Sequence, residues 1–335
     1  DAWPKTAELA APEAHQASID EAGAEKFVVV AIPRRGNMCT PNEFIAEFVG
    51  RFPGRAVGLS SVDPEDPGAA DEFEFAVTKL GLKGIKLSPV YQSMDPRSAN
   101  CYKLYEIAQA RKVPVMYHVG GAYTGSLEFG DPFLLDKVAH DFPDMKIIVA
   151  HFGQPYMEQT CILMRKNENI FADLSARFHR PWQLYHGIMI AQEYRVTDRL
   201  LFGSDFPVRT TAEALAEFRA INEWGQGANM PRIPEDIIEG IINDRPLSLL
   251  GIYLGFVVWA TGSLWAGVLV HLLNNGLAVM VTAFARQSPD LDLDSIEAMG
   301  EATLAAGRPG EIVRIGPADP ALKVPHMGWN DLVID

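Results

Sequence analysis

Three side chains able to bind a metal ion each follow an apolar, β-branched segment of the chain. The segments are VMYHVG (115–120), IVAHFG (148–153) and LFGSDFP (201–207). They carry His118, His151 and Asp205. A polar group at the end of a buried strand costs free energy unless a partner binds it. The carboxyl ends of parallel strands meet on one face of a barrel, so the pattern predicts a hydrolytic metal centre there.

A divalent metal ion is the cofactor that these residue types predict, with Zn²⁺ preferred and Mn²⁺ or Fe²⁺ as alternatives. Neutral imidazoles and a carboxylate are suitable ligands, so we expect His118, His151 and Asp205 to bind the ion. Such an ion lowers the pKa of bound water towards ~7. Asp205 and His151 would be the catalytic residues. Asp205 would take the proton of the water, and His151 would bind an oxygen on which charge develops.

Seven apolar segments that could position these side chains are predicted to be strands, and helical segments alternate with them. The predicted strands are 26–32, 56–62, 83–87, 113–119, 146–151, 169–174 and 199–203. All seven are nearly continuously apolar, as strands buried on both faces should be. The alternation predicts an α/β fold, a (β/α)8 TIM-type barrel that lacks its first strand. We expect the missing strand to lie before residue 1. A doubly wound open sheet is the alternative, but no GxGxxG follows the first strand.

Five motifs in this region resemble those of the amidohydrolase-related family of metal-dependent barrel hydrolases and decarboxylases. They are GLKGIKL (81–87), VPVMYH (113–118), FPDMKIIVAHFG (142–153), NIFADLS (169–175) and LLFGSDFP (200–207). The resemblance covers residues 7–251. It implies that His118 ligates metal, that His151 ligates metal or polarises the substrate, and that Asp205 contacts the metal. The family's His-x-His pair on its first strand is absent from this sequence. Two of the usual ligands are therefore missing.

Basic side chains near the predicted strand ends suggest how a substrate would be held. Arg177 and His179 follow the segment 169–174. They would bind an anionic substrate. A solvated loop is the alternative for both. Lys86 is interpreted as a strand-end lysine in a polar cluster, although related metal sites sometimes use a carboxylated lysine at this place.

Composition narrows the classes of partner and the compartment. The formal net charge is −14 and no basic cluster is present. Nucleic acid is therefore not expected as a partner. Cys39, Cys101 and Cys161 form no CxxC motif. This fits a reducing compartment better than a disulfide framework. We therefore expect the barrel to be cytoplasmic and its partner to be a small-molecule substrate.

The character of the chain changes after Arg245. Residues 246–285 contain no Asp, Glu, Lys or Arg. Residues 249–285 are therefore a candidate for membrane association. The apolar helical segment 252–286 resembles the last motif of CAAX-protease-like intramembrane metalloproteases, in which a histidine and an asparagine share one helix face. Here these would be His271 and Asn275. A packed apolar hairpin is the alternative.

The end of the chain is predicted to hold a linker, 287–308, and a short β-rich tail, 309–335. The tail contains PHMGWN (325–330) and resembles the glutaminase subunit of imidazole glycerol phosphate synthase. That family's nucleophilic cysteine lies in a Gly-rich elbow, which none of the cysteines here has, so we expect this fragment to be inert. Together with the barrel, 1–251, and the apolar segment, 252–286, these make four predicted parts.

The leading hypothesis is a metal-dependent hydrolase or decarboxylase. It would act on a small carboxylate, amide or lactone through metal-activated water. One alternative is a catalytically inactive composite or fragment chain, because three partial resemblances follow one another. Another alternative is a membrane-associated protein that uses residues 249–285.

Overall fold

The computed structural model describes residues 11–32, 40–225 and 229–244. The chain divides into two units, Asp1–Gly267 and Val268–Asp335, and every described residue belongs to the first. The predicted apolar segment, linker and tail (252–286, 287–308 and 309–335) lie outside the described residues, as do residues 246–251. In the part of the chain that is described, no helix is long and apolar enough to cross a membrane.

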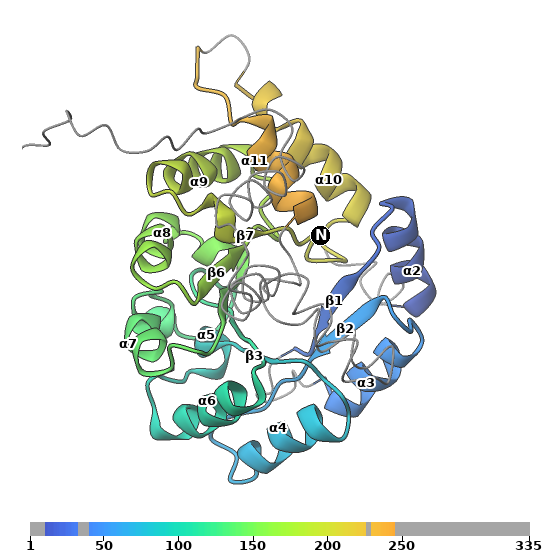
Figure 1. Ribbon diagram of the computed structural model, residues 1–335, viewed down its shortest axis with the longest axis vertical. Helices are drawn as coiled ribbons and strands as arrows, with labels where there is room; N and C mark the ends of the chain where they lie inside the picture. The colour runs from blue at the N-terminus through green and yellow to red at the C-terminus, as the bar shows by residue number, and fades with distance from the viewer. Residues whose placement is uncertain (1–10, 33–39, 226–228, 245–335) are drawn as a thin grey trace, which may run out of the picture. The chain divides into compact units, whose positions relative to one another are not determined.

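Parallel strands form the centre of the first unit and confirm all seven predicted strand segments, with shorter bounds. They are β1 (Phe27–Val30), β2 (Ala56–Leu59), β3 (Ile85–Leu87), β4 (Val115–Tyr117), β5 (Ile147–Val149), β6 (Ile170–Asp173) and β7 (Leu200–Leu201). Strands β3 to β7 form one sheet in chain order, and β1 pairs with β2. A bridge between Ser60 and Ile85 joins the two sheets. Each strand thus lies beside its neighbour in sequence (Figure 1). This is the strand order of a barrel.

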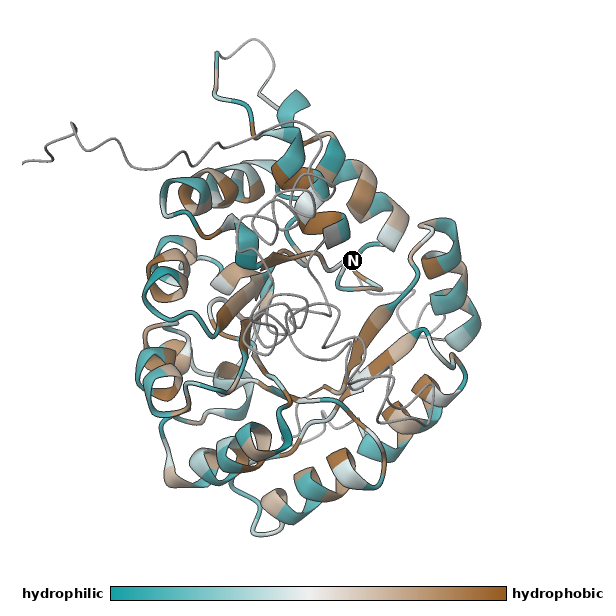
Figure 2. Ribbon diagram, in the orientation of Figure 1, coloured by the Kyte–Doolittle hydropathy of each residue, from teal (hydrophilic) through white to brown (hydrophobic). Residues whose placement is uncertain are grey.

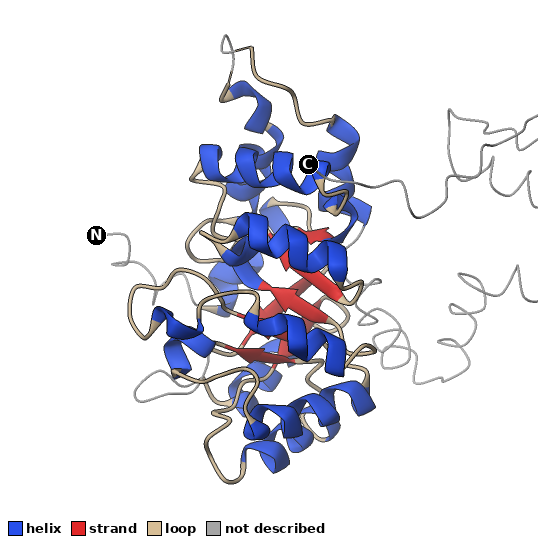
Figure 3. Ribbon diagram, turned by 90° about the vertical axis from the view of Figure 1, so that its left-hand side faces the viewer, coloured by secondary structure: helices blue, strands red, loops and turns tan. Residues whose placement is uncertain are grey.

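Helices alternate with the strands and surround them (Figures 1 and 3). They are α2 (Pro12–Glu21), α3 (Asn42–Gly50), α4 (Ala69–Thr78), α5 (Pro89–Gln92), α6 (Ala99–Arg111), α7 (Leu134–Asp141), α8 (Met157–Lys166), α9 (Pro181–Glu193), α10 (Thr211–Arg219) and α11 (Glu235–Glu239). Capping residues in the sequence determine where some of these helices begin, because a capping side chain accepts a hydrogen bond from a free backbone N–H of the first turn. The Ser98 hydroxyl caps α6, and Thr210 with Glu213 forms a capping box on α10. The short α5, which follows β3 directly, was not predicted.

The two faces of the sheet pack against different partners because side chains alternate along a strand. Ile85, Val115 and Ile147 lie in register and belong to the large core shared with the helices. Their neighbours Met116 and Ile148 belong instead to a small apolar cluster with Val57, Phe171 and Leu201, which fills the interior between the strands. In Figure 2 the strands are mostly brown and the outer helix surfaces mostly teal, which matches this division.

The barrel is open between β1 and β7, since neither strand has a second neighbour among the described residues. Helices meet across this gap. The backbone N–H of Thr211 on α10 donates to Ser18 Oγ on α2 at 3.0 Å. The ring of His15 stacks on Phe206, with centroids 4.9 Å apart. The expectation of a TIM-type α/β barrel is therefore confirmed, and contacts between α2 and α10 span the open edge that the described strands leave.

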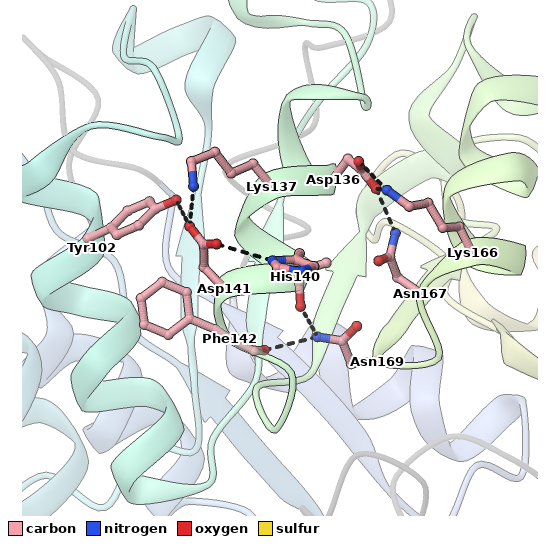
Figure 4. Close-up of polar contacts among 10 residues, drawn as sticks. Tyr102, Asp136, Lys137, His140, Asp141, Phe142, Lys166, Asn167 and Asn169 are labelled. Atoms are coloured by element: carbon pink, nitrogen blue, oxygen red, sulfur yellow. Dashed lines mark hydrogen bonds and ion pairs between the residues drawn. The ribbon is translucent and has the colours of Figure 1, made fainter.

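Polar contacts fasten the turns at the amino ends of β5 and β6 (Figure 4). Tyr102 on α6 donates to Asp141 on α7 at 2.6 Å, and Lys166 on α8 pairs with Asp136 on α7. Asn169, 6% exposed, donates from Nδ2 to the carbonyl oxygens of Ala139, Phe142 and Met145 at 3.0–3.2 Å. One buried amide thereby holds the end of α7 and the turn that leads into β5.

Replacing Asn169 by alanine should lower the free energy of unfolding by about 2–3 kcal/mol, because buried carbonyl groups lose their donor. Urea unfolding of the full chain, followed by circular dichroism, measures this. Asn100→Ala is the matched control, since the Asn100 amide makes only exposed contacts, of 3.3 Å each, with Glu65 and Lys103. Loss of these surface contacts should cost no more than about 0.5 kcal/mol. Equal stability of the two variants would contradict the role given to Asn169.

Candidate active site at the carboxyl ends of the strands

The structure brings His118 and His151 together at the carboxyl ends of neighbouring strands. His118 follows β4 and lies two residues after the inward-facing Met116. His151 follows β5. Their ring centroids are 5.0 Å apart and the ring planes meet at 70°. Both residues are half-buried. Two of the three predicted ligands are therefore neighbours.

His151 lies in a left-handed turn that a buried carboxylate holds in place. The backbone φ angle is 54° at His151 and 56° at Phe152. Residues other than glycine seldom adopt this conformation. The backbone N–H of His151 donates to Asp173 Oδ1 at 3.2 Å. Asp173 ends β6, so the end of one strand fixes the turn that follows its neighbour.

Ser175 determines which nitrogen of His151 carries the proton. The Ser175 hydroxyl donates to Asp173 Oδ1. That carboxylate oxygen can only accept. Ser175 Oγ lies 2.8 Å from His151 Nδ1, and because its single hydrogen is already used, it must accept there. His151 therefore carries its proton on Nδ1, and Nε2 keeps its lone pair.

His118 adopts the opposite tautomer. Its Nε2 lies 3.1 Å from the carbonyl oxygen of Gly121. A carbonyl oxygen can only accept, so Nε2 carries the proton. Nδ1 keeps the lone pair. The ring of Tyr91 on α5 lies 4.9 Å from the His118 ring, centroid to centroid, and supports it from the side.

Burial and nearby cations keep both imidazoles neutral. Burial, then the charge of Lys86 and then His151, lowers the pKa of His118 to about 3. Burial, then Lys86 and then Arg177, lowers the pKa of His151 to about 3. At neutral pH each ring thus offers one unprotonated nitrogen, as a metal ligand or a general base requires.

Asp205 follows β7 and shares this electrostatic environment. Its backbone is left-handed, with φ 58°. Part of the Asp205 residue is exposed to solvent. Removal of water from the carboxyl by the surrounding protein, and then the negative charge of Asp173, raises its pKa, whereas Lys86 and Arg177 oppose the rise. A carboxyl with a raised pKa is suited to take up and return a proton.

Arg177 lies just beyond Ser175 and is 8% exposed. Burial, and then Arg180, lowers its pKa to about 10, so the guanidinium stays charged at neutral pH. It donates to Gln183 Oε1 at 3.1 Å, while its buried Nε has no partner among the described residues. An unsatisfied buried donor on a cation is suited to an anionic ligand.

His179 lies further along the same loop. Burial, and then three arginines of which Arg209 is first, lowers its pKa. Nε2 accepts from Arg180 at 3.2 Å, and the buried Nδ1 has no partner in the described part of the chain. No described contact joins His179 to the two other histidines, so its substrate-binding role stays a prediction.

A metal ion finds suitable donor types here but only part of a coordination set. His118 and His151 supply two neutral imidazoles with free lone pairs, and Asp205 supplies a carboxylate. Across the described residues, however, no group of three or more His, Cys, Asp or Glu side chains is arranged to hold one ion. The three-residue ligand set that the sequence predicts stays a prediction.

Sequence reasoning missed two residues of this site. Ser175 was not singled out, although the Asp-x-Ser spacing after a predicted strand is compatible with a carboxylate and hydroxyl meeting in one turn. Tyr91 was missed because α5 was not predicted. The sequence predicts that Lys86 belongs to a polar cluster, and in the structure the charges of Asp173 and Asp205 act on it.

Curated relatives match only a short stretch of the chain. The imidazole glycerol phosphate synthase subunit HisH of Cereibacter sphaeroides is 77% identical over 26 residues, and that of Ruegeria pomeroyi is 73% identical over 26 residues. These stretches are 8% of this chain, and the chain spans 12% of the length of either relative. A family model described as type II CAAX prenyl endopeptidase Rce1-like matches residues 232–277.

Solved structures resemble the barrel. An uncharacterised TIM-barrel protein from Bordetella bronchiseptica has a TM-score of 0.59 at 20% identity, covering 75% of this chain and 85% of that one. The 5-carboxyvanillate decarboxylase LigW from Sphingomonas paucimobilis has a TM-score of 0.51 at 16% identity, covering 68% and 79%. A dihydroxybenzoic acid decarboxylase from Polaromonas, with bound manganese, has a TM-score of 0.52 at 20% identity, covering 71% and 86%. At these identities the likeness shows the fold.

One family accounts for most of the chain. The family model described as amidohydrolase matches residues 1–250, which include every described strand and helix. Strand order, the histidines after β4 and β5, and the aspartate after β7 all lie within this match. The chain belongs to the amidohydrolase family.

Proposed function

We propose that the barrel is a hydrolase or decarboxylase that uses a divalent metal ion and acts on a small carboxylate, amide or lactone. The observation that carries this proposal is the adjoining pair His118 and His151, both neutral and each with one free lone pair at the carboxyl ends of the strands. The similar structures named as decarboxylases, one of them with manganese, support it.

His118, His151 and Asp205 would hold the ion, with Zn²⁺ proposed first and Mn²⁺ or Fe²⁺ as alternatives. When bound, the ion would supply a Lewis acid for a substrate oxygen and a water of lowered pKa. Imidazole nitrogens and a carboxylate oxygen are ligands that all three metals accept.

Side chains of the protein would transfer protons, orient His151 and bind the substrate. Asp205, with its raised pKa, would accept a proton from the nucleophile or substrate and return it to the leaving group. Ser175, backed by Asp173, would keep the lone pair of His151 on Nε2. Arg177 would bind the substrate carboxylate through its free Nε, and His179 would lie beside it.

Metal content is the first test. The purified full chain, incubated with Zn²⁺ or Mn²⁺ and dialysed, should retain about one equivalent, and His151→Ala and Asp205→Asn should each weaken retention about tenfold or more. His140→Asn is the matched control, because the His140 side chain is 81% exposed on α7 and should leave retention unchanged. Retention below about a tenth of an equivalent by wild type would favour the alternative of a catalytically inactive composite or fragment chain.

Activity is the second test. A panel of small aromatic carboxylates and lactones should contain a compound that the metal-loaded protein converts, detected by loss of ultraviolet absorbance or release of CO₂. Asp205→Asn should lower kcat about 10²–10⁴-fold, since proton transfer by a positioned carboxyl is lost. His140→Asn should retain wild-type kcat. An unchanged kcat in the Asp205 variant would remove that residue from the mechanism.

The tautomer of His151 provides a third test that needs no substrate. In metal-free protein, long-range ¹H–¹⁵N spectra should show His151 protonated on Nδ1 and His118 on Nε2. Ser175→Ala removes the acceptor for Nδ1, so we expect His151 to shift to a mixture of tautomers. His118 is the internal control and should keep its pattern. An unchanged His151 pattern in this variant would show that another group fixes the ring.

A further inference from the structure

Lys86 faces the interior of the barrel. Lys86 on β3 lies in register with Met116 on β4. Met116 lies in register with Ile148 on β5, and Ile148 with Phe171 on β6. These three apolar partners belong to the interior cluster, whereas the residues on either side of Lys86 belong to the helix-facing core. Its long side chain therefore starts inside the barrel, one inward layer below His118 and Asp173, which follow Met116 and Phe171 by two residues.

The Lys86 residue is almost fully buried, and its ammonium group has no described partner. Lys86 is 7% exposed, and among the described residues its Nζ takes part in no hydrogen bond or ion pair. The residue interacts electrostatically with His118, His151, Asp173 and Asp205, which places its charge at the mouth that holds the histidine pair. Burial lowers the pKa of Lys86, and the negative charges of Asp173 and Asp205 oppose this shift without cancelling it. Burying the charge here therefore costs the folded protein some stability.

Arg177 is a second buried cation at the carboxyl ends of the strands. The nearby carboxylates form no described ion pair with Lys86 or with Arg177. Asp173 Oδ1 already accepts from the backbone N–H groups of His151 and Ser175 and from the Ser175 hydroxyl. Within the described ranges neither Lys86 nor Arg177 forms an ion pair, and Arg177 Nε is unsatisfied. Two cations, each more than nine-tenths buried, thus have donors available for a ligand.

We propose that Lys86 is a substrate-binding residue whose ammonium group forms the floor of the site and binds an acidic group of the substrate. Together with Arg177 it selects small molecules that carry two acidic groups over those that carry one. This inference rests on the proposed function, and it assigns a specificity-determining role to a residue on β3.

Calorimetric titration of the full chain, freed of metal by a chelator, tests the proposal. The probes are isophthalate, which has two carboxylates, and benzoate, which has one. Wild type should bind isophthalate more tightly than benzoate. Lys86→Met should weaken isophthalate binding about tenfold or more, as loss of a charge-assisted hydrogen bond implies. It should also reduce the preference for isophthalate.

The matched control is Lys146→Met. Lys146 lies two residues before Ile148, at the opposite end of the barrel, and its ammonium group is 5.8 Å from the centroid of the Phe171 ring. Removal of this cation should leave the affinity for both probes unchanged. Thermal unfolding checks the fold, and Lys86→Met should have a Tm equal to or above that of wild type, because methionine suits an apolar layer.

The outcomes separate the two proposals. Binding by wild type with equal affinity in the folded Lys86 variant would overturn the role of Lys86 and leave the proposed function standing. Binding of neither probe by wild type would overturn Lys86 as an anion-binding residue, while metal retention and substrate conversion would still decide the proposed function. An equal loss of affinity for isophthalate in the Lys86 and Lys146 variants would show a general effect of net charge, and it would also overturn the proposal.

Discussion

The hydrogen bonds accepted by the Asp173 carboxylate are the interaction on which the site depends. Oδ1 binds the backbone of His151, the backbone of Ser175 and the Ser175 hydroxyl. These bonds stabilise the left-handed turn at residues 151–152. Such a turn is costly for residues other than glycine. The same bonds orient the hydroxyl that fixes the His151 tautomer. One carboxylate at the end of β6 therefore controls the position and the proton of a ring on the neighbouring strand.

The open edge of the barrel lies away from this arrangement. Lys86, His118, His151 and Asp173 all come from β3 to β6 or the turns that follow them, and these strands are consecutive members of one sheet. Their relative positions depend on backbone ladders inside that sheet and on the helices packed against it. The gap between β1 and β7 is covered by contacts of α2 with α10, such as Thr211 with Ser18. Most of the site therefore lies on strands that do not border the open edge.

The amino-acid sequence was sufficient to predict the strands, because buried parallel strands are apolar throughout. It also predicted that His118 and His151 lie close together, because the carboxyl ends of neighbouring parallel strands lie side by side. It could not predict how those rings are held. The contact between Ser175 and His151 depends on two turns meeting, one of them left-handed at residues without glycine, and no local pattern indicates that. The inward direction of Lys86 was equally hidden, since a continuously apolar strand gives no alternation from which to read its face.

The burial of Lys86 relates stability to ligand binding. Met116, Ile148 and Phe171 show that this layer of the interior packs with apolar side chains, so the fold does not need a charge there. An ammonium group at that position destabilises the empty site, and an anion that contacts it offsets the cost only in the folded protein. Ligand binding and folding are therefore coupled at this residue. The proposed anionic ligand would account for a lysine in a layer that is otherwise apolar.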